Sequence, residues 1–123
     1  HGEGYSVFND TVVAVRQLRK EGLLRRAVVI DLDVHQGNGT AALCRLDPDT
    51  FTLSVHGAKN YPIRKERSDL DVELPDRCGD AEYLAAVEAA AGRAVRETRA
   101  DLAVYVAGAD PFEHDRLGRL AVT

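Results

Sequence analysis

The chain has 123 residues, of which 45% are hydrophobic and 29% are charged, and its formal net charge is −4. This composition excludes collagen-like, low-complexity and disordered chains, and the sequence holds no stretch of about 20 apolar residues that could span a membrane. The acidic balance argues against nucleic acid as a partner held by bulk electrostatics. The two cysteines, Cys44 and Cys78, form neither a disulfide framework nor a Cys-x-x-Cys metal site, and we expect a cytoplasmic protein.

The first half of the chain predicts a helix, a strand and a second, short helix. Asn9 or Asp10 is a suitable N-cap for a helix that runs to about Lys20, because apolar residues recur there at helical spacing. Residues 27–30 are a continuous run of small and β-branched side chains, which is typical of a strand buried on both faces. A short helix is expected at residues 40–46.

The second half predicts a strand, a long loop, a helix and another strand. Residues 51–55 favour a strand, whereas residues 57–79 favour a surface loop with a short extended piece near residues 70–74. Asp80 is expected to cap a helix that ends near residue 98, and residues 102–107 to form another buried strand. This alternation predicts an α/β fold with a mostly parallel sheet and helices on both faces.

Polar side chains follow the first predicted strand at its carboxyl end. If the extended backbone continues, Asp31, Asp33 and His35 project to one side of it, and Leu32 and Val34 project to the other. Binding crevices of open α/β sheets lie at this edge. Carboxylate oxygens and an imidazole nitrogen suit zinc, iron or manganese better than calcium. The spacing therefore predicts a metal site.

The last predicted strand is followed by a further carboxylate, Asp110, which would face the same crevice. Together with Asp33 and His35 it makes three protein ligands, and three ligands with an open position are typical of a catalytic metal site. A plainer interpretation exists for each segment, because Asp-x-Asp-x-His is often a loop with acidic caps and Asp-Pro is a common turn. Spacing alone leaves both interpretations open.

Other polar residues are assigned structural roles. We expect His56 to be a packed or hydrogen-bonded imidazole and His114 to be solvated. Residues 64–67 (RKER) are interpreted as a charged loop face. Among the four histidines, His1 is the weakest candidate for a site residue.

Several short motifs follow one another in a distinctive order. The segment VIDLDVHQGNGT occupies residues 29–40. The other motifs lie at residues 2–10 (GEGYSVFND), 54–56 (SVH), 61–62 (YP), 107–111 (AGADP) and 115–118 (DRLG). In this order they resemble the zinc-dependent histone deacetylases and their bacterial relatives, which include the acetylpolyamine amidohydrolases. The similarity covers nearly the whole chain and is greatest to the bacterial, class IV-like branch.

The resemblance implies a metal site and a substrate channel. Asp33, His35 and Asp110 match the family's ligands for Zn²⁺, with Fe²⁺ as an alternative metal. Tyr5 would form one wall of the narrow channel for the acyl-lysine stem, and Tyr61 the opposing wall. The implied fold is the three-layer arginase/deacetylase-like fold, present in part.

The resemblance also implies roles for polar residues beside the metal. Asp31 would orient a catalytic histidine, and Asn38 lies where the family has Asp or Asn in contact with a second catalytic histidine. A structural K⁺ ion would be held by the side chains of Asp31 and Ser54 and by the backbone carbonyls of Asp33, His35 and Val55.

The resemblance further implies that residues 1–123 are the central part of a single deacetylase-like catalytic domain, with flanking parts missing at both ends. The family's tandem histidines would precede Gly2 and its oxyanion-stabilising tyrosine would follow Thr123, so we expect the chain alone to be inactive. The implied function of the parent protein is zinc-dependent removal of acetyl groups, by attack of metal-activated water, from acetyl-lysine peptides, acetylated polyamines or similar small amines. The sequence predicts no membrane partner and no particular oligomeric state.

Two other classes of function remain. A non-catalytic acyl-lysine or acyl-amine binding module would keep the pocket, although the intact set of Asp33, His35 and Asp110 favours catalysis. A binuclear hydrolase of the arginase type would require additional carboxylate and histidine ligands around the metal, which the sequence pattern does not supply.

Overall fold

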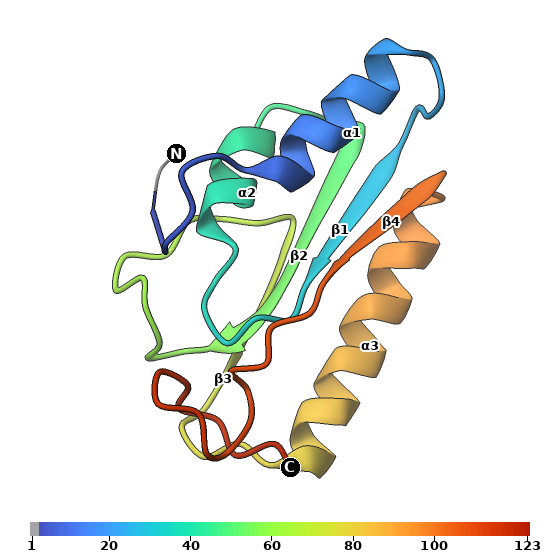
Figure 1. Cartoon of the computed structure of the whole chain (residues 1–123). Coiled ribbons are helices and arrows are strands. Elements are labelled where there is room, and N and C mark those ends of the chain that lie inside the picture. Colours follow the sequence, from blue (N-terminus) through green and yellow to red (C-terminus); the bar gives the residue numbers. More distant parts are fainter. Residues whose placement is uncertain (1–2) are drawn as a thin grey trace.

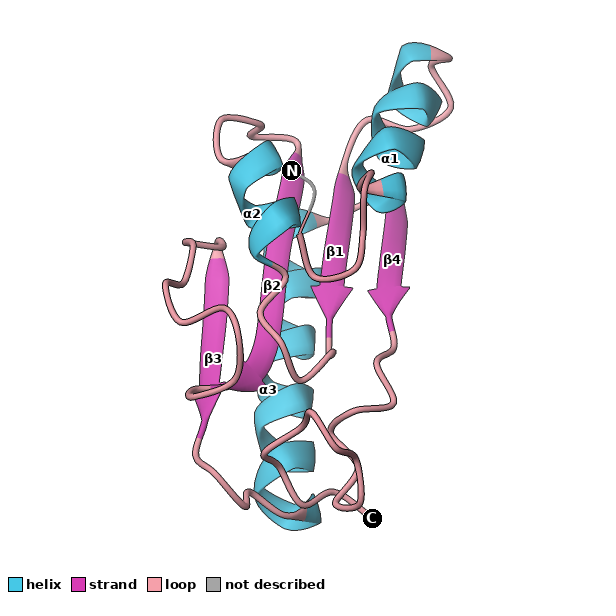
Figure 2. Ribbon diagram, turned by 60° about the vertical axis from the view of Figure 1, so that its left-hand side comes forward, coloured by secondary structure: helices cyan, strands magenta, loops and turns pink. Residues whose placement is uncertain are grey.

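The computed structural model describes residues 3–123 and contains a four-stranded parallel sheet. Its elements in chain order are α1 (Asp10–Lys20), β1 (Ala27–Asp31), α2 (Asn38–Cys44), β2 (Thr50–Gly57), β3 (Leu70–Leu74), α3 (Asp80–Thr98) and β4 (Leu102–Val106). The strand order is β3-β2-β1-β4. Helices α1 and α2 lie on one face of the sheet and α3 lies on the other (Figures 1 and 2). The predicted fold class is confirmed.

The two long helices differ in how their first turns are capped. The Asn9 side chain accepts a hydrogen bond from Val12 N at 2.9 Å, which confirms it as the N-cap of α1. In α3 the N-cap is Gly79, so the prediction of an Asp80 cap is wrong. The Asp80 carboxylate instead accepts hydrogen bonds from the backbone N and Oγ1 of Thr123. This distant partner binds the carboxylate that would otherwise cap the helix.

The sheet has an apolar face beneath α3 and a more polar face beneath α1 and α2. The apolar face contributes to the main core, whose buried members are Val28, Leu32, Val34, Leu53, Val55, Leu74, Cys78, Ala90, Ala94 and Leu120. On the opposite face, the register places Asp31 beside Ser54 and Ser54 beside Asp71. Because side chains alternate along strands, these three lie in one polar row across β1, β2 and β3. The row marks the part of the sheet on which the candidate site is built.

Helix α2, strand β3 and strand β4 each differ in one respect from the sequence prediction. Helix α2 covers residues 38–44 and is shifted toward the N-terminus from the expected 40–46. The short extended piece expected near residues 70–74 is present and is a full strand of the sheet, because it pairs in parallel with β2, and Leu74 is buried. Strand β4 is only half-buried, with Tyr105 63% exposed, because it pairs with β1 alone within residues 3–123.

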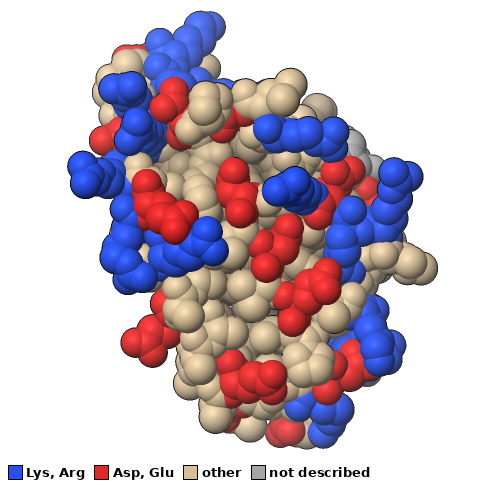
Figure 3. Space-filling view, turned by 180° about the vertical axis from the view of Figure 1, so that it is seen from behind, with Lys and Arg blue, Asp and Glu red and all other residues tan. Residues whose placement is uncertain are grey.

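The outer surface carries charges of both signs. Seen from behind, basic side chains gather mainly along the margins and acidic side chains lie between them (Figure 3). On α3, Arg93 Nε donates to Glu97 Oε1 at 2.7 Å, a spacing that supports a solvent-facing helix. Within residues 3–123, no helix combines the length and apolar character needed to cross a membrane.

Candidate metal centre

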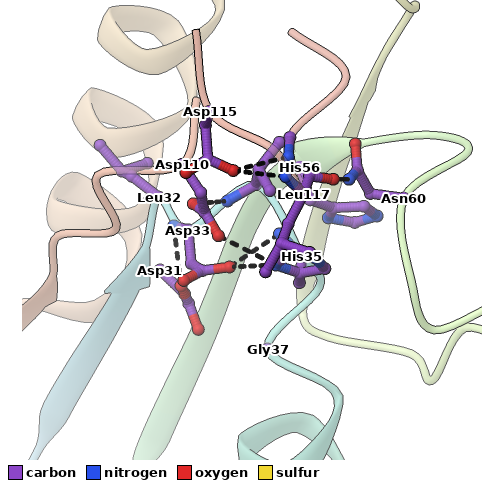
Figure 4. Close-up of polar contacts among 12 residues, drawn as sticks. Asp31, Leu32, Asp33, His35, Gly37, His56, Asn60, Asp110, Asp115 and Leu117 are labelled. Atoms are coloured by element: carbon purple, nitrogen blue, oxygen red, sulfur yellow. Dashed lines mark hydrogen bonds and ion pairs between the residues drawn. The ribbon is translucent and has the colours of Figure 1, made fainter. Parts of the chain in front are cut away.

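Three side chains from two neighbouring strand ends converge at the carboxyl edge of the sheet. Asp33 and His35 lie in the turn after β1, and Asp110 lies in the loop after β4 (Figure 4). His35 Nδ1 is 2.9 Å from Asp33 Oδ1 and 3.0 Å from Asp110 Oδ2. One potential ligand atom from each residue lies within 4.8 Å of the others. The structure therefore brings together the three residues that the sequence predicted as a set.

The backbone turns after Asp31 instead of continuing as a strand. Asp31 Oδ1 accepts a hydrogen bond from Asp33 N at 3.1 Å, and Asp33 Oδ1 accepts one from His35 N at 2.8 Å. These local bonds between carboxylates and backbone N–H groups stabilise the turn. Leu32 and Val34 are buried in the main core. The predicted alternation of polar and apolar side chains is thus kept, although the extended backbone on which it was based is not.

Asp110 is fixed against this turn by a hydrogen bond and by a close backbone approach. Its Oδ1 accepts a hydrogen bond from Val34 N at 2.9 Å. A Cβ added at Gly108 would lie 2.6 Å from Asp33 Cα and 2.8 Å from Asp33 Oδ2, closer than real Cβ atoms come. Only glycine fits there. Gly108 was not among the predicted site residues, although a glycine between a strand end and a ligand is a signal for such a close approach.

Burial, together with neighbouring negative charge, raises the pKa of Asp31 and of Asp110. Burial is the main cause that raises the pKa of Asp31 to about 7; the backbone N–H of Asp33 opposes this, and the charges of Asp33 and Asp110 add to it. Burial also raises the pKa of Asp110, against the hydrogen bond from Val34 N, and the nearby Asp33 carboxylate adds to the rise. Crowded negative charges of this kind favour protonation unless a cation is bound among them.

The donor set fits a divalent metal ion. Two carboxylates and an imidazole are ligands that zinc accepts, and a tetrahedral zinc site places neighbouring ligand atoms about 3.4 Å apart, close to the separations seen around His35. The side chains of His35, Asp33 and Asp110 are 27%, 34% and 17% exposed, and all three line a cavity of about 590 Å³. The accessible side leaves space for a further ligand. Within residues 3–123 no other His, Cys, Asp or Glu joins this set, so the additional ligands of a binuclear centre are not found there.

The two predicted channel residues line the same cavity. Tyr5 is 99% exposed, whereas Tyr61 is 48% exposed and its hydroxyl donates a hydrogen bond to Glu3 Oε1. Asn38, the first residue of α2, donates from Nδ2 to Glu3 Oε2 at 3.1 Å. Glu3 therefore joins Tyr61 to Asn38, a contact that the sequence analysis did not foresee. The expectation for His1 lies outside the described residues.

Two of the residues predicted to hold potassium, Asp33 and His35, are also candidate metal ligands, and the other three lie on the adjoining strands β1 and β2. Asp31 and Ser54 are register partners on adjacent strands, and both are buried, as is Val55. Ser54 Oγ accepts a hydrogen bond from Gly37 N at 3.3 Å and lies 2.9 Å from His56 Nδ1. Neighbouring carboxylate and hydroxyl oxygens on one face of the sheet suit a hard cation. His56 itself is fully buried and hydrogen-bonded, as predicted, and burial lowers its pKa.

The predictions for His114 and for residues 64–67 have different outcomes. His114 is confirmed as exposed, with 75% of its side chain accessible. The interpretation of residues 64–67 as a charged loop face is wrong for Lys65, which is half-buried and donates to the backbone oxygens of Asn60 and Pro62. The loop folds back on itself, so carbonyl groups turned inward need a donor, and the lysine supplies it.

The sequence profile of the histone deacetylase domain matches residues 1–123. The chain belongs to this family. This histone deacetylase domain is 42% identical over 123 residues to an uncharacterized protein of Picosynechococcus sp., and the match covers 100% of the chain and 41% of that protein. It is 33% identical over 130 residues to the chloroplastic histone deacetylase 10 of Oryza sativa subsp. japonica, with 98% of the chain and 29% of that protein covered.

Solved structures agree on the fold. The acetylpolyamine aminohydrolase from Burkholderia pseudomallei superposes on the histone deacetylase domain with a TM-score of 0.84 at 25% identity, and the match covers 98% of this chain and 38% of that one. The resemblance inferred from the motifs and the arginase/deacetylase-like fold are confirmed. The chain spans less than half the length of each of these relatives.

Proposed function

We propose that the protein containing this domain is a zinc-dependent amidohydrolase that removes acetyl groups from acetyl-lysine or a similar acylated amine. The observation that carries the proposal is the convergence of Asp33, His35 and Asp110 in a cavity that Tyr5 and Tyr61 also line. Three ligands with an accessible side suit catalysis better than a closed structural site. Membership of the histone deacetylase domain family supports the reaction, and the likeness to an acetylpolyamine aminohydrolase supports an acylated amine as substrate.

The site residues would have different chemical roles. Asp33, His35 and Asp110 would hold zinc, which when bound supplies Lewis acidity that polarises an amide carbonyl and lowers the pKa of water. The buried carboxylate of Asp31 would accept a hydrogen bond from a catalytic histidine outside this chain and keep that imidazole oriented for proton transfer. Asn38 would orient a second histidine in the same way. Residues 1–123 would then form the central part of one catalytic domain.

Residues around the metal ligands would bind the substrate and stabilise the turn that carries the ligands. Tyr5 and Tyr61 would clamp the aliphatic stem of the acylated amine between their rings and keep bulk water from the reacting carbonyl. We assign a structural potassium site to the side-chain oxygens of Asp31 and Ser54 and the backbone carbonyls of Asp33, His35 and Val55. Ligation at these positions would tie β2 to the turn that carries two of the zinc ligands.

Acetate release by the full-length protein tests this proposal. We expect release from an acetyl-lysine peptide or an acetylated polyamine, and complete loss of release when a chelator removes the metal. Asp110→Asn should lower both zinc content and activity. Glu88→Gln makes the same change of charge on the exposed surface of α3 and should alter neither.

Three results would contradict parts of the proposal. Acetate release that resists the chelator would exclude the metal mechanism. Unchanged zinc content in Asp110→Asn would refute the ligand assignment. Retained zinc with no release from either substrate class would favour the non-catalytic binding module.

A further inference from the structure

The connection between β2 and β3, residues 58–69, carries Tyr61 and is called the Tyr61 loop below. We propose that Gln36 and Lys65 are positioning residues that fix Tyr61 relative to the turn bearing the metal ligands. Neither residue belongs to the predicted metal, potassium or channel set. The inference rests on the proposed function, in which Tyr61 forms a channel wall.

Gln36 joins the metal-ligand turn to the far half of the Tyr61 loop. It directly follows His35 and is only 4% exposed. Its Nε2 donates to Glu66 O at 2.8 Å and to Asp71 Oδ1 at 2.9 Å, while its Oε1 accepts from Glu66 N at 2.8 Å. The reciprocal pair with the N–H and C=O of one loop residue fixes both the position and the orientation of the backbone at that point.

The hydrogen bonds of Gln36 connect to the polar row of the sheet. Asp71 is the register partner of Ser54, and its second carboxylate oxygen accepts a hydrogen bond from Ser68 N at 2.8 Å. One carboxylate therefore binds both Gln36 and the end of the Tyr61 loop. Loss of the Gln36 side chain would leave partly buried backbone groups of Glu66 without a partner, which is costly.

Lys65 extends this link to Tyr61 itself. Its Nζ donates to Asn60 O and to Pro62 O, both at 2.6 Å, and these two carbonyls flank Tyr61. The ammonium group thus holds the near half of the loop to the residue next to Glu66. A continuous path of contacts runs from the metal-ligand turn through Gln36, Glu66 and Lys65 to the backbone on either side of Tyr61.

A further contact anchors the same part of the loop to the segment that carries Asp110. Asn60 is 3% exposed, and its Nδ2 donates to Leu117 O at 2.8 Å (Figure 4). Tyr61 is consequently connected to both segments that supply metal ligands. A small displacement of either connection would move the wall of the channel relative to the reacting carbonyl, and such displacements weaken substrate positioning.

Methionine substitutions in the zinc-loaded, full-length protein test the two residues separately. Gln36→Met and Lys65→Met keep unbranched side chains of similar length but remove the hydrogen bonds. We expect amide hydrogen exchange in the Tyr61 loop to become about tenfold faster, as for a loss of about 1.4 kcal/mol of local stability. Zinc content should stay unchanged, KM for the acetylated substrate should rise by a similar factor, and kcat should change less.

Matched controls are available for both substitutions. Gln17→Met makes the first change at an exposed position of α1, and Arg64→Met removes an exposed cation next to Lys65. Within residues 3–123, Arg64 makes no hydrogen bond or ion pair. Both control proteins should match the unmodified protein in exchange rate and in KM.

A double-mutant cycle with Tyr61→Ala asks whether the effect passes through Tyr61. If it does, Gln36→Met will raise KM in the unmodified protein but not in the Tyr61→Ala protein. Equal increases in both backgrounds, or unchanged loop exchange in both methionine variants, would overturn the inference. A KM increase that only follows a loss of zinc would overturn it as well. Absence of acetate release by the unmodified protein would instead contradict the proposed function, and the exchange measurements would still test whether Gln36 and Lys65 hold the loop.

Discussion

Replacing Gly108 with alanine should loosen the metal centre without altering a ligand. The added Cβ would lie 2.6 Å from Asp33 Cα, whereas ordinary van der Waals contact begins at 3.4 Å. A backbone atom has no rotamer by which to move aside, so the two segments would have to separate by about 0.8 Å. Metal–ligand distances vary by only about 0.2 Å, so Asp33 and Asp110 would no longer reach one ion well. We expect zinc affinity to fall about 10- to 100-fold and the free energy of unfolding by about 1–3 kcal/mol.

Competition with a chromophoric chelator would measure this loss in the full-length protein, and thermal unfolding would measure the change in stability. Gly79→Ala is the matched control, because its added Cβ would meet nothing closer than 3.9 Å. This control should keep the zinc affinity of the unmodified protein. Unchanged zinc affinity and stability in Gly108→Ala would refute the argument that the two ligand-bearing segments touch at this glycine.

Three predictions concern stability, measured by urea or thermal unfolding. Leu53→Ala, at a 1% exposed position of β2, should lower the free energy of unfolding by about 2–5 kcal/mol. Leu46→Ala, at a 92% exposed position, should change it by less than about 0.5 kcal/mol. Equal effects of the two substitutions would contradict the assigned core. Gly92→Ala inside α3 should stabilise the protein by about 0.5–1 kcal/mol, since its Cβ would meet only the flexible end of an arginine side chain, and a loss of stability would refute this. Burial raises the pKa of Asp47, but hydrogen bonds from Arg19 and a threonine outweigh it and hold the pKa below its usual value. The stabilisation from Asp47 is therefore present above the unfolded-state pKa of about 4 and is lost as the pH falls through the lower folded-state pKa. Asp47→Asn should consequently cost about 1 kcal/mol of stability at neutral pH and less near pH 3. A cost that does not depend on pH would refute this prediction.

The regular elements were largely predictable because they depend on local patterns. The β-branched run before Asp31 produced a central strand, and the helical spacing of apolar residues produced α3. The exceptions depend on distant partners. Asp80 has the residue type of an N-cap but bonds to Thr123. The extended piece expected at residues 70–74 is part of the sheet because β2 lies beside it.

In the candidate site, too, the features set by local patterns were predictable and those set by distant contacts were not. The residue types of Asp33, His35 and Asp110 and their places after strands predicted one cluster, because carboxyl ends of parallel strands meet at one edge. The contacts of Gln36 and Lys65 were not predicted: no role was assigned to Gln36, and Lys65 was interpreted as part of a charged loop face, because such residues in polar segments are usually exposed to solvent. Their hydrogen bonds run to backbone groups about 30 residues away or across a folded loop.

Local patterns in the sequence predicted the fold class and indicated Asp33, His35 and Asp110 as candidate metal ligands, and the order of the motifs indicated the family. The fold class and the candidate ligands depend on short-range patterns: alternation along a strand, periodicity along a helix, and ligand types at strand ends. The close approach of Gly108 to Asp33 and the hydrogen bonds between Gln36 and the Tyr61 loop become visible only in the folded protein. Both features arise where backbones distant in sequence approach within contact distance. Such approaches are set by the packing of the whole sheet and its helices, which no local pattern of residues encodes.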